Sequence, residues 1–250
     1  MVGRAVLMLV SLACYAAFFV SFVYLVGWVG AFGFMPTHVD KGTSASAGIS
    51  VGGAVLINLA LLALFGIQHS VMARKGFKQW WTQIVPQPVE RSIYCLATAA
   101  VLGAMFLWWQ PLPGTIWSAE NELIRLVILA IFFLGWAILF VATLLLNHFE
   151  LFGLQQAWHN FRGRDPAAMT MKTPFLYKIV RHPIQTGVFI AIWATPDMTV
   201  GHLLFAFGYT IYILIGLHFE EKDLIAQFGD EYADYRRKVG SILPGIGKSR

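Results

Sequence analysis

The stretch IQTGVFIAIWATPDMTVGHLLFAFGYTIYILIGLHF, residues 184–219, decides the fold. Its apolar run is broken only at residues 195–197, Thr-Pro-Asp, where proline and aspartate favour a turn. We therefore divide it into a short arm, Ile184–Ala194, and a longer arm, Val200–Phe219. Because an apolar helix needs about 20 residues to cross the hydrocarbon core of a bilayer, the long arm predicts a membrane span. The short arm either extends at its start or is partly re-entrant.

The rest of the chain has the same apolar character. Its residues are 58% hydrophobic and 12% charged, whereas soluble domains carry about 25% charged residues. Four more segments are long and apolar enough to span: Ala5–Phe32, Ile49–Met72, Ser92–Trp109 and Leu123–Leu146. The first segment is much longer than the apolar core of a signal peptide, so we expect it to be retained as a membrane helix. The fold class predicted is an all-α polytopic membrane bundle of five or six transmembrane helices. We expect a single domain, with residues 1–146 as N-terminal helices and residues 147–250 as polar segments plus the hairpin.

The basic residues predict an orientation. With the N-terminus in the cytoplasm, only Lys41 and Arg125 of the 18 basic residues fall on the outer side. Lys and Arg concentrate in cytoplasmic segments of membrane proteins, so we expect both termini inside and an even number of crossings. The net charge of +5 could suggest a nucleic-acid partner. Because the basic residues cluster beside apolar runs, we expect them to face membrane lipids, and we expect no nucleic acid.

A polar motif precedes the hairpin: Arg181, His182 and Pro183, followed by Gln185 and Gly187. Proline suits the first turn of a helix because its missing N–H costs nothing there. A helix N-terminus can also receive an anion. The glycine, one turn later, would allow close approach of a ligand or of a neighbouring helix. The alternative is an interfacial arginine anchor with a packing glycine.

A second polar motif, Glu220 and Glu221, follows the hairpin. Two carboxylates at the end of a membrane helix are costly unless they are solvated or paired. One could accept hydrogen bonds from a ligand, and the other could pair with Arg181 or Arg236. A solvated helix end is the alternative.

An amphipathic segment, Asp223–Val239, comes next. Apolar and aromatic residues recur in it at helical spacing, at Leu224, Ile225, Phe228, Tyr232 and Tyr235. Gly229 is expected to end one helix and Asp230 to cap the next.

A third polar segment, NHFELFGLQQ at residues 147–156, directly follows the span Leu123–Leu146. His148 is a candidate general base, and Glu150 is the candidate group that orients it. The alternative is an interfacial loop whose polar groups cap the preceding helix. The candidate substrate-binding residues are His148, Phe149, Phe152, Gln155 and Gln156.

Arg-His-Pro-x-x-x-Gly at 181–187, Glu-Glu-x-x-Leu-x-x-x-Phe-Gly-x-x-Tyr-x-x-Tyr at 220–235, and then Val239 and Pro244 resemble the isoprenylcysteine carboxyl methyltransferase-like superfamily of integral membrane methyltransferases. The resemblance covers roughly Tyr177 to Pro244. It implies S-adenosylmethionine as cofactor, S-adenosylhomocysteine as product, and a cytoplasmic cofactor pocket. The residues that it implies for this pocket are Tyr177, Arg181, His182, Pro183, Gln185, Gly187, Glu220, Glu221, Tyr232 and Arg236.

The segment at 147–156 looks like the bacterial branch of the superfamily, which methylates methanethiol to dimethyl sulfide. Prenylcysteine carboxyl methyltransferases resemble this chain but carry an arginine just before the Glu pair, where this chain has Leu217, His218 and Phe219. A carboxylate substrate would lack its bidentate partner, so we expect a small neutral thiol that enters from the bilayer or through a narrow apolar tunnel. Because a thiol attacks as its thiolate, a base or a field that lowers the thiol pKa is needed. His148 is the first candidate base and His182 the second, and the cationic sulfonium of the donor also favours a thiolate beside it.

Two other functions remain open at this point: methylation of a prenylcysteine carboxylate or lipid, and a non-enzymatic role as transporter or assembly factor. The two cysteines, Cys14 and Cys95, lie in apolar runs, and the histidines form no close pairs, so we predict neither a disulfide framework nor a metal site. The orientation and the branch together suggest a bacterial inner membrane. The sequence leaves the oligomeric state open.

Overall fold

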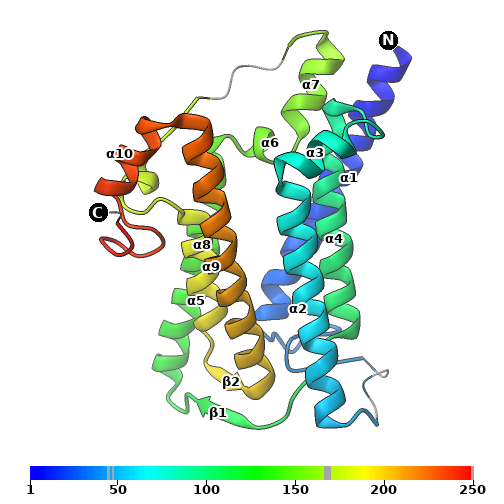
Figure 1. Cartoon of the computed structure of the whole chain (residues 1–250). Helices are drawn as coiled ribbons and strands as arrows, with labels where there is room; N and C mark the ends of the chain where they lie inside the picture. Colours follow the sequence, from blue (N-terminus) through cyan, green and yellow to red (C-terminus); the bar gives the residue numbers. More distant parts are fainter. Residues whose placement is uncertain (44–45, 47, 166–169, 249–250) are drawn as a thin grey trace. The chain divides into compact units, whose positions relative to one another are not determined.

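The computed structural model describes residues 1–43, 46, 48–165 and 170–248 (Figure 1). Five of its helices are long and apolar enough to cross a membrane, which confirms the prediction of a polytopic helical membrane protein. The elements are α1 Val2–Val29, α2 Val51–Ala73, α3 Lys75–Trp81, η2 Gln87–Val89, α4 Glu90–Trp108, β1 Thr115–Ser118, α5 Glu122–Leu146, α6 His148–Leu151, α7 Leu154–Arg162, η3 Phe175–Lys178, α8 Pro183–Trp193, β2 Asp197–Thr199, α9 Val200–Phe228 and α10 Asp230–Lys238.

The described residues form two compact units. The first unit holds α1 to α4, α6 and α7, together with the first three residues of α9. The second unit holds the two strands, α5, α8, α10 and the rest of α9.

In the first unit α1 packs against α4, and α4 packs against α2 (Figure 1). The buried hydroxyl of Ser92 donates to that of Ser11 at 3.0 Å, which joins α4 to α1. Gly153, between α6 and α7, lies so close to α4 that a Cβ there would come within 2.8 Å of the Ser92 backbone nitrogen. Its φ of +89° also favours glycine. These contacts fix α6 and α7 on the start of α4.

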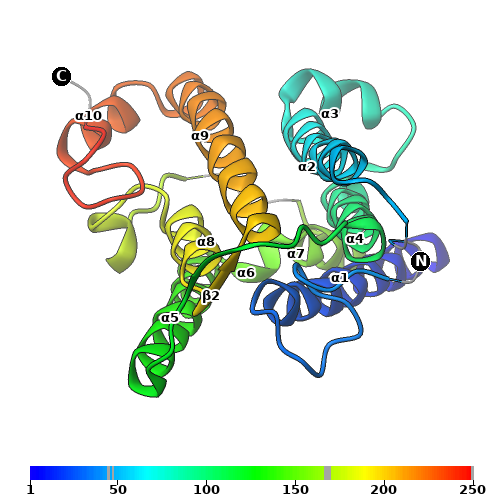
Figure 2. The same cartoon turned by 90° about the horizontal axis from the view of Figure 1, so that it is seen from below.

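In the second unit α5 packs extensively against α8 (Figure 2). A Cβ at Gly187 would lie 2.5 Å from the carbonyl oxygen of Gly135 and 2.7 Å from the nitrogen of Leu139. A Cβ at Gly135 would meet the Gly187 carbonyl oxygen at 2.7 Å. The two glycines therefore let the backbones touch, as small residues do between membrane helices. The expected close approach at Gly187 is to a helix.

The short arm of the hairpin is α8, which has 11 residues and begins at Pro183. The proline occupies the first helical turn, as predicted. At 1.5 Å per residue the helix is about 16 Å long, which is too short to span by itself. The helix is not lengthened at its start, because a 3₁₀ turn and a bend precede it.

The turn after α8 leads into a strand that the sequence did not indicate. β2 pairs antiparallel with β1. The guanidinium of Arg125, in the first turns of α5, donates two hydrogen bonds to the Asp197 carboxylate, at 2.9 and 2.6 Å, and the hydroxyl of Ser118 adds a third at 2.6 Å. These bonds hold the α8–α9 turn against the start of α5.

The long arm extends beyond its predicted end. α9 continues through Glu220 and Glu221 to Phe228, and Gly229 with φ of +57° ends it as expected. The prediction that Asp230 caps the next helix is wrong. Asp230 is the first residue inside α10, and Gly229, which has no side chain, occupies the N-cap position. The acidic side chain still lies in the first turn, where the helix dipole favours it.

Candidate functional site

The two polar motifs of the C-terminal half meet in the second unit around one carboxylate, that of Glu221. Arg181 donates to its Oε1 from Nε at 2.8 Å and from a terminal nitrogen at 2.6 Å. Nε2 of His182 lies 3.1 Å from the same oxygen. Nε of Arg236 is 3.1 Å from Oε2, near enough for an ion pair but not aligned as a hydrogen bond. The Arg181 and His182 side chains are 1% and 3% exposed, so the carboxylate compensates charge in a dry site.

All five N–H donors of Arg181 have acceptors inside the protein. Besides the two bonds to Glu221, its guanidinium donates to the carbonyl oxygens of Arg236 and Gly247, at 3.2 and 3.0 Å, and to that of Val239. No donor is left for a ligand. The guanidinium therefore links Glu221 to backbone carbonyls near the C-terminus, whereas the sequence suggested a cofactor contact for Arg181.

Two of these carbonyls, those of Val239 and Gly247, belong to a C-terminal strap, residues 239–247, which lies beside the start of α8. The backbone N–H of Arg181 donates to the Gly240 carbonyl at 2.8 Å, and that of His182 donates to the Ser241 carbonyl at 3.2 Å. The hydroxyl of Thr186 donates to the Ile242 carbonyl at 2.8 Å. The strap thus covers one flank of the motif, and Arg181 joins it to Glu221.

Two other side chains of this cluster, Glu220 and Tyr232, have polar atoms that could bind a ligand. Glu220 is 44% exposed, and Gln185 donates to it at 3.2 Å. Tyr232, on α10, is only 4% exposed, yet its hydroxyl has no hydrogen-bond partner among the described residues. Burial, followed by the charge of Glu221, raises the pKa of Tyr232 far above its ordinary range, so the phenol stays protonated as a donor. A buried hydroxyl without a partner costs free energy, so this phenol is a donor that a bound ligand could satisfy.

Two further tyrosines support the cluster. The buried Tyr177 hydroxyl donates to the Ala142 carbonyl on α5 at 3.4 Å. The hydroxyl of Tyr235 donates to the Tyr177 carbonyl, and burial raises the pKa of Tyr235 to about 12. Both hydroxyls point at backbone, so these side chains anchor η3 and α10.

The third polar segment, apart from Asn147, lies in the first unit. His148, at the start of α6, is 8% exposed, and its Nε2 lies 2.8 Å from the hydroxyl of Tyr15 on α1. Asn147 before it has φ of +130°, which is uncommon for any residue with a side chain. Burial lowers the pKa of His148, so the imidazole is neutral at pH 7 and can accept a proton.

The other candidate substrate residues lie in different environments. The Phe152 ring is 4.8 Å from that of His148, centroid to centroid. Phe149 makes an edge contact at 5.6 Å but is 57% exposed. Gln156 donates to the Glu150 carbonyl at 3.0 Å, and the neighbouring Gln155 is half-buried. Phe152 and the more exposed Phe149 thus both border the imidazole of His148.

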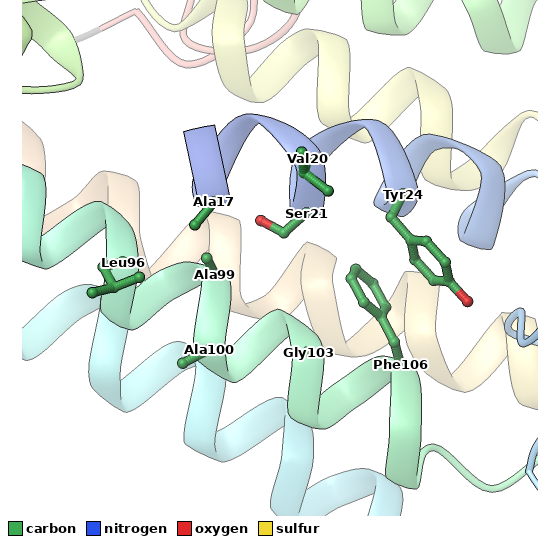
Figure 3. A pocket seen from close by; sticks show the side chains of 9 residues that line it. All are labelled: Ala17, Val20, Ser21, Tyr24, Leu96, Ala99, Ala100, Gly103 and Phe106. Carbon is green, nitrogen blue, oxygen red and sulfur yellow. The ribbon is translucent and has the colours of Figure 1, made fainter. Parts of the chain in front are cut away.

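The first unit also has an apolar groove between α1 and α4, with a volume of about 410 Å³ (Figure 3). Its only hydroxyl groups, on Ser21 and Tyr24, bond to the Phe18 carbonyl and to Thr37. The groove therefore offers no reacting group, and the chemistry belongs to the polar clusters. Its lining residues are Ala17, Val20, Ser21, Tyr24, Leu96, Ala99, Ala100, Gly103 and Phe106.

Similar proteins identify the family. The chain is 48% identical to a methanethiol S-methyltransferase of Pseudomonas deceptionensis, over 90% of this chain and 82% of the relative. It is 47% identical to a methanethiol S-methyltransferase of Mycobacterium tuberculosis, over 93% of each chain. The chain belongs to the methanethiol S-methyltransferase family. A 29% identity with nurim of Danio rerio covers 68% of the chain and 64% of that protein.

These similarities confirm the resemblance to the wider membrane methyltransferase superfamily. No family model matches the chain. No solved structure matches it.

The residues that the sequence missed are those that act through distant contacts. Tyr15 lies in an apolar span of this methyltransferase and belongs to none of the sequence motifs. The sequence motif includes Val239 and Pro244 of the strap, residues 239–247, but the pairing of the strap with residues 180–182 is seen only in the structure. Among the residues that the structure describes, no three histidine, cysteine or acidic side chains gather as a metal site would require.

Proposed function

We propose that the chain methylates methanethiol to dimethyl sulfide with S-adenosylmethionine as methyl donor. Membership of the methanethiol S-methyltransferase family supports the reaction. The observation that supports S-adenosylmethionine as methyl donor is the unpartnered Tyr232 hydroxyl beside the Glu220–Glu221 pair.

The residues of the second unit suit such a ligand. Glu220 offers an exposed carboxylate that can accept hydrogen bonds from ribose hydroxyls or an amino group. Tyr232 offers a neutral donor, and the first turn of α8 after His182 offers a helix N-terminus for a carboxylate. Glu221 holds His182 and Arg181 in place rather than contacting the ligand by its Oε1.

S-adenosylmethionine supplies an electrophilic methyl group on a positively charged sulfur. The protein must hold a thiol in line with it and remove the thiol proton. His148 is the proposed base. The S–H proton moves to the imidazole, the electron pair stays on sulfur, and the new S–C bond forms as the old one breaks. The residues before Glu220 offer no arginine for a carboxylate substrate, which supports a neutral acceptor.

The test is a methyl-transfer assay with purified protein in nanodiscs, labelled S-adenosylmethionine and a panel of acceptors. Methanethiol should yield labelled dimethyl sulfide. Transfer to a prenylcysteine but to no small thiol would overturn the acceptor and leave the donor standing. Failure to bind S-adenosylhomocysteine would overturn both and favour a transporter or assembly factor.

The same proposal puts both termini on the cytoplasmic side of a bacterial inner membrane, where the donor is made. Single cysteines at positions 41 and 248 test it, because the native Cys14 and Cys95 are buried. A membrane-impermeant reagent outside should label position 41 only. Labelling of position 248 instead would reverse the orientation.

A further inference from the structure

The segment that joins α2 to α4, residues 74–91, holds more positive than negative charge. Because α2 and α4 are consecutive spans of the first unit that pack together, this connection lies at one membrane surface, and α3 begins there directly after α2 (Figure 1). The only acidic residue of the segment is Glu90, which is buried. Its four basic residues are Arg74, Lys75, Lys78 and Arg91. An excess of positive charge therefore lies at the level of the lipid headgroups.

Lys78, on α3, lies within reach of the charges around it. Burial lowers the pKa of its ammonium, the positive charge of Arg91 lowers this pKa further, Glu90 raises it, and Arg74 lowers it again. Three cations and one carboxylate are therefore close enough to act on one another. A bound anion would offset both the burial of the ammonium and its repulsion by the arginines.

The aromatic side chains of α3 form a cluster. The Phe77 ring lies 5.4 Å from that of Trp80 and 5.9 Å from that of Trp81, and the two indoles are 5.8 Å apart, centroid to centroid. Trp80 is 52% exposed, and Ile84, just after the helix, is 66% exposed. Tryptophan is favoured where apolar chains meet headgroups. This exposed apolar surface suits the outer part of the hydrocarbon.

The indole N–H of Trp81 needs an acceptor. Its Nε1 is buried and has no hydrogen-bond partner among the residues that the structure describes. Trp81 follows Lys78 by three positions on α3, and helical residues three apart lie on one face. An ammonium and an N–H donor therefore share a face, and the phosphate oxygens of a lipid are acceptors for both.

We propose that this face of α3, together with Arg91, binds an anionic phospholipid. The phosphate lies against Lys78 and the Trp81 N–H, and the acyl chains lie against Trp80 and Ile84. The occupant is a lipid rather than a free anion because exposed apolar side chains adjoin the cations on one short segment. The site lies apart from the residues assigned to methyl transfer and does not depend on that reaction.

The test measures lipid binding to the purified protein in detergent by native mass spectrometry, with phosphatidylglycerol and phosphatidylcholine as probes. Both lipids carry a phosphate, but only phosphatidylglycerol has a net negative charge. The parent should bind phosphatidylglycerol about 10-fold more tightly, and Lys78→Gln should remove this preference, since it deletes the ammonium. Trp81→Phe keeps an aromatic ring but removes the donor, so it should weaken both lipids alike, by about 3- to 5-fold.

Lys75→Gln is the matched control, because it removes the same charge from an exposed position of the same helix. It should change the Kd of phosphatidylglycerol less than about 2-fold, as exposed charges contribute little. Lys78→Arg keeps the charge and should keep the preference. Without added lipid, Lys78→Gln should melt at or above the temperature of the parent, because it removes a half-buried and repelled charge, so its lost binding does not reflect unfolding.

Three outcomes would overturn the proposal. Equal losses in Lys75→Gln and Lys78→Gln would show diffuse attraction of the whole segment rather than a seated headgroup. A parent that binds the two lipids equally would have no site for an anion. Dimers in nanodiscs that Trp80→Ala converts to monomers would assign this face to a second copy of the chain.

Discussion

The C-terminal strap should loosen when Arg181 is replaced by lysine. Lysine keeps the positive charge but has three donors on one nitrogen in place of the five of arginine. At least two of the five observed bonds must be lost. The carboxylate of Glu221 attracts the ammonium most strongly, so we expect the bonds to the strap carbonyls of Val239 and Gly247 to go. At about 1.5 kcal/mol for each bond from a charged donor, the loss is about 3 kcal/mol, or about 100-fold in the equilibrium that opens the strap.

Hydrogen exchange followed by mass spectrometry can measure this opening in nanodiscs. The backbone N–H groups of Arg181 and His182 donate to strap carbonyls, and that of Ser241 donates to the Ile246 carbonyl. Their exchange should accelerate about 100-fold in the variant, because it tracks local opening. Arg236→Lys is the control. Arg236 makes one ion pair and its side chain is 29% exposed, so its exchange pattern should stay near that of the parent.

Two results would refute this reasoning. Unchanged exchange in Arg181→Lys would mean that the backbone pairing alone holds the strap. Weaker binding of S-adenosylhomocysteine with unchanged exchange would mean that Arg181 contacts the ligand directly, contrary to its occupied donors. The expected result is that exchange and Kd rise together.

Three other predictions concern the remaining parts of the two units. Tyr232→Phe should raise the Kd of S-adenosylhomocysteine about 5- to 10-fold and leave the melting temperature of the ligand-free protein equal or higher, because its hydroxyl has no partner there; a fall in the melting temperature would contradict this. Gly187→Ala should destabilise the protein by about 1–3 kcal/mol, since its Cβ would meet backbone atoms of α5, whereas Gly216→Ala, with open space around it, should cause no loss in a denaturation series. The kcat/KM of methanethiol methylation should fall on acidification only below the ordinary histidine pKa of about 6.5, because burial lowers the pKa of His148 and the active base is neutral. If kcat/KM already falls with decreasing pH above about 6.5, His148 is not the base.

The local features of the fold followed from the sequence because each depends on neighbouring residues. Apolar runs of about 20 residues predict spans within a few residues of the observed helices, as for α5 at Glu122–Leu146, except at the end of α9, which continues to Phe228. Pro183 starts a helix and Gly229 ends one by virtue of their own backbone preferences. The pairing of Glu221 with Arg181 or Arg236 was also foreseeable, since buried charges must be compensated.

The role of each polar residue depended on contacts between segments far apart in the chain. Arg181 looks like a ligand-binding residue until the strap carbonyls are seen to occupy its donors. The sequence allows Gly187 to contact either a ligand or a neighbouring helix, and only the structure shows that it packs against α5. The partner of His148 comes from the opposite end of the chain. Helix and turn propensities act over a few residues, so the sequence determined where the helices lie and which polar groups flank them. Hydrogen-bond partners are chosen by packing in three dimensions, which only the tertiary structure decided.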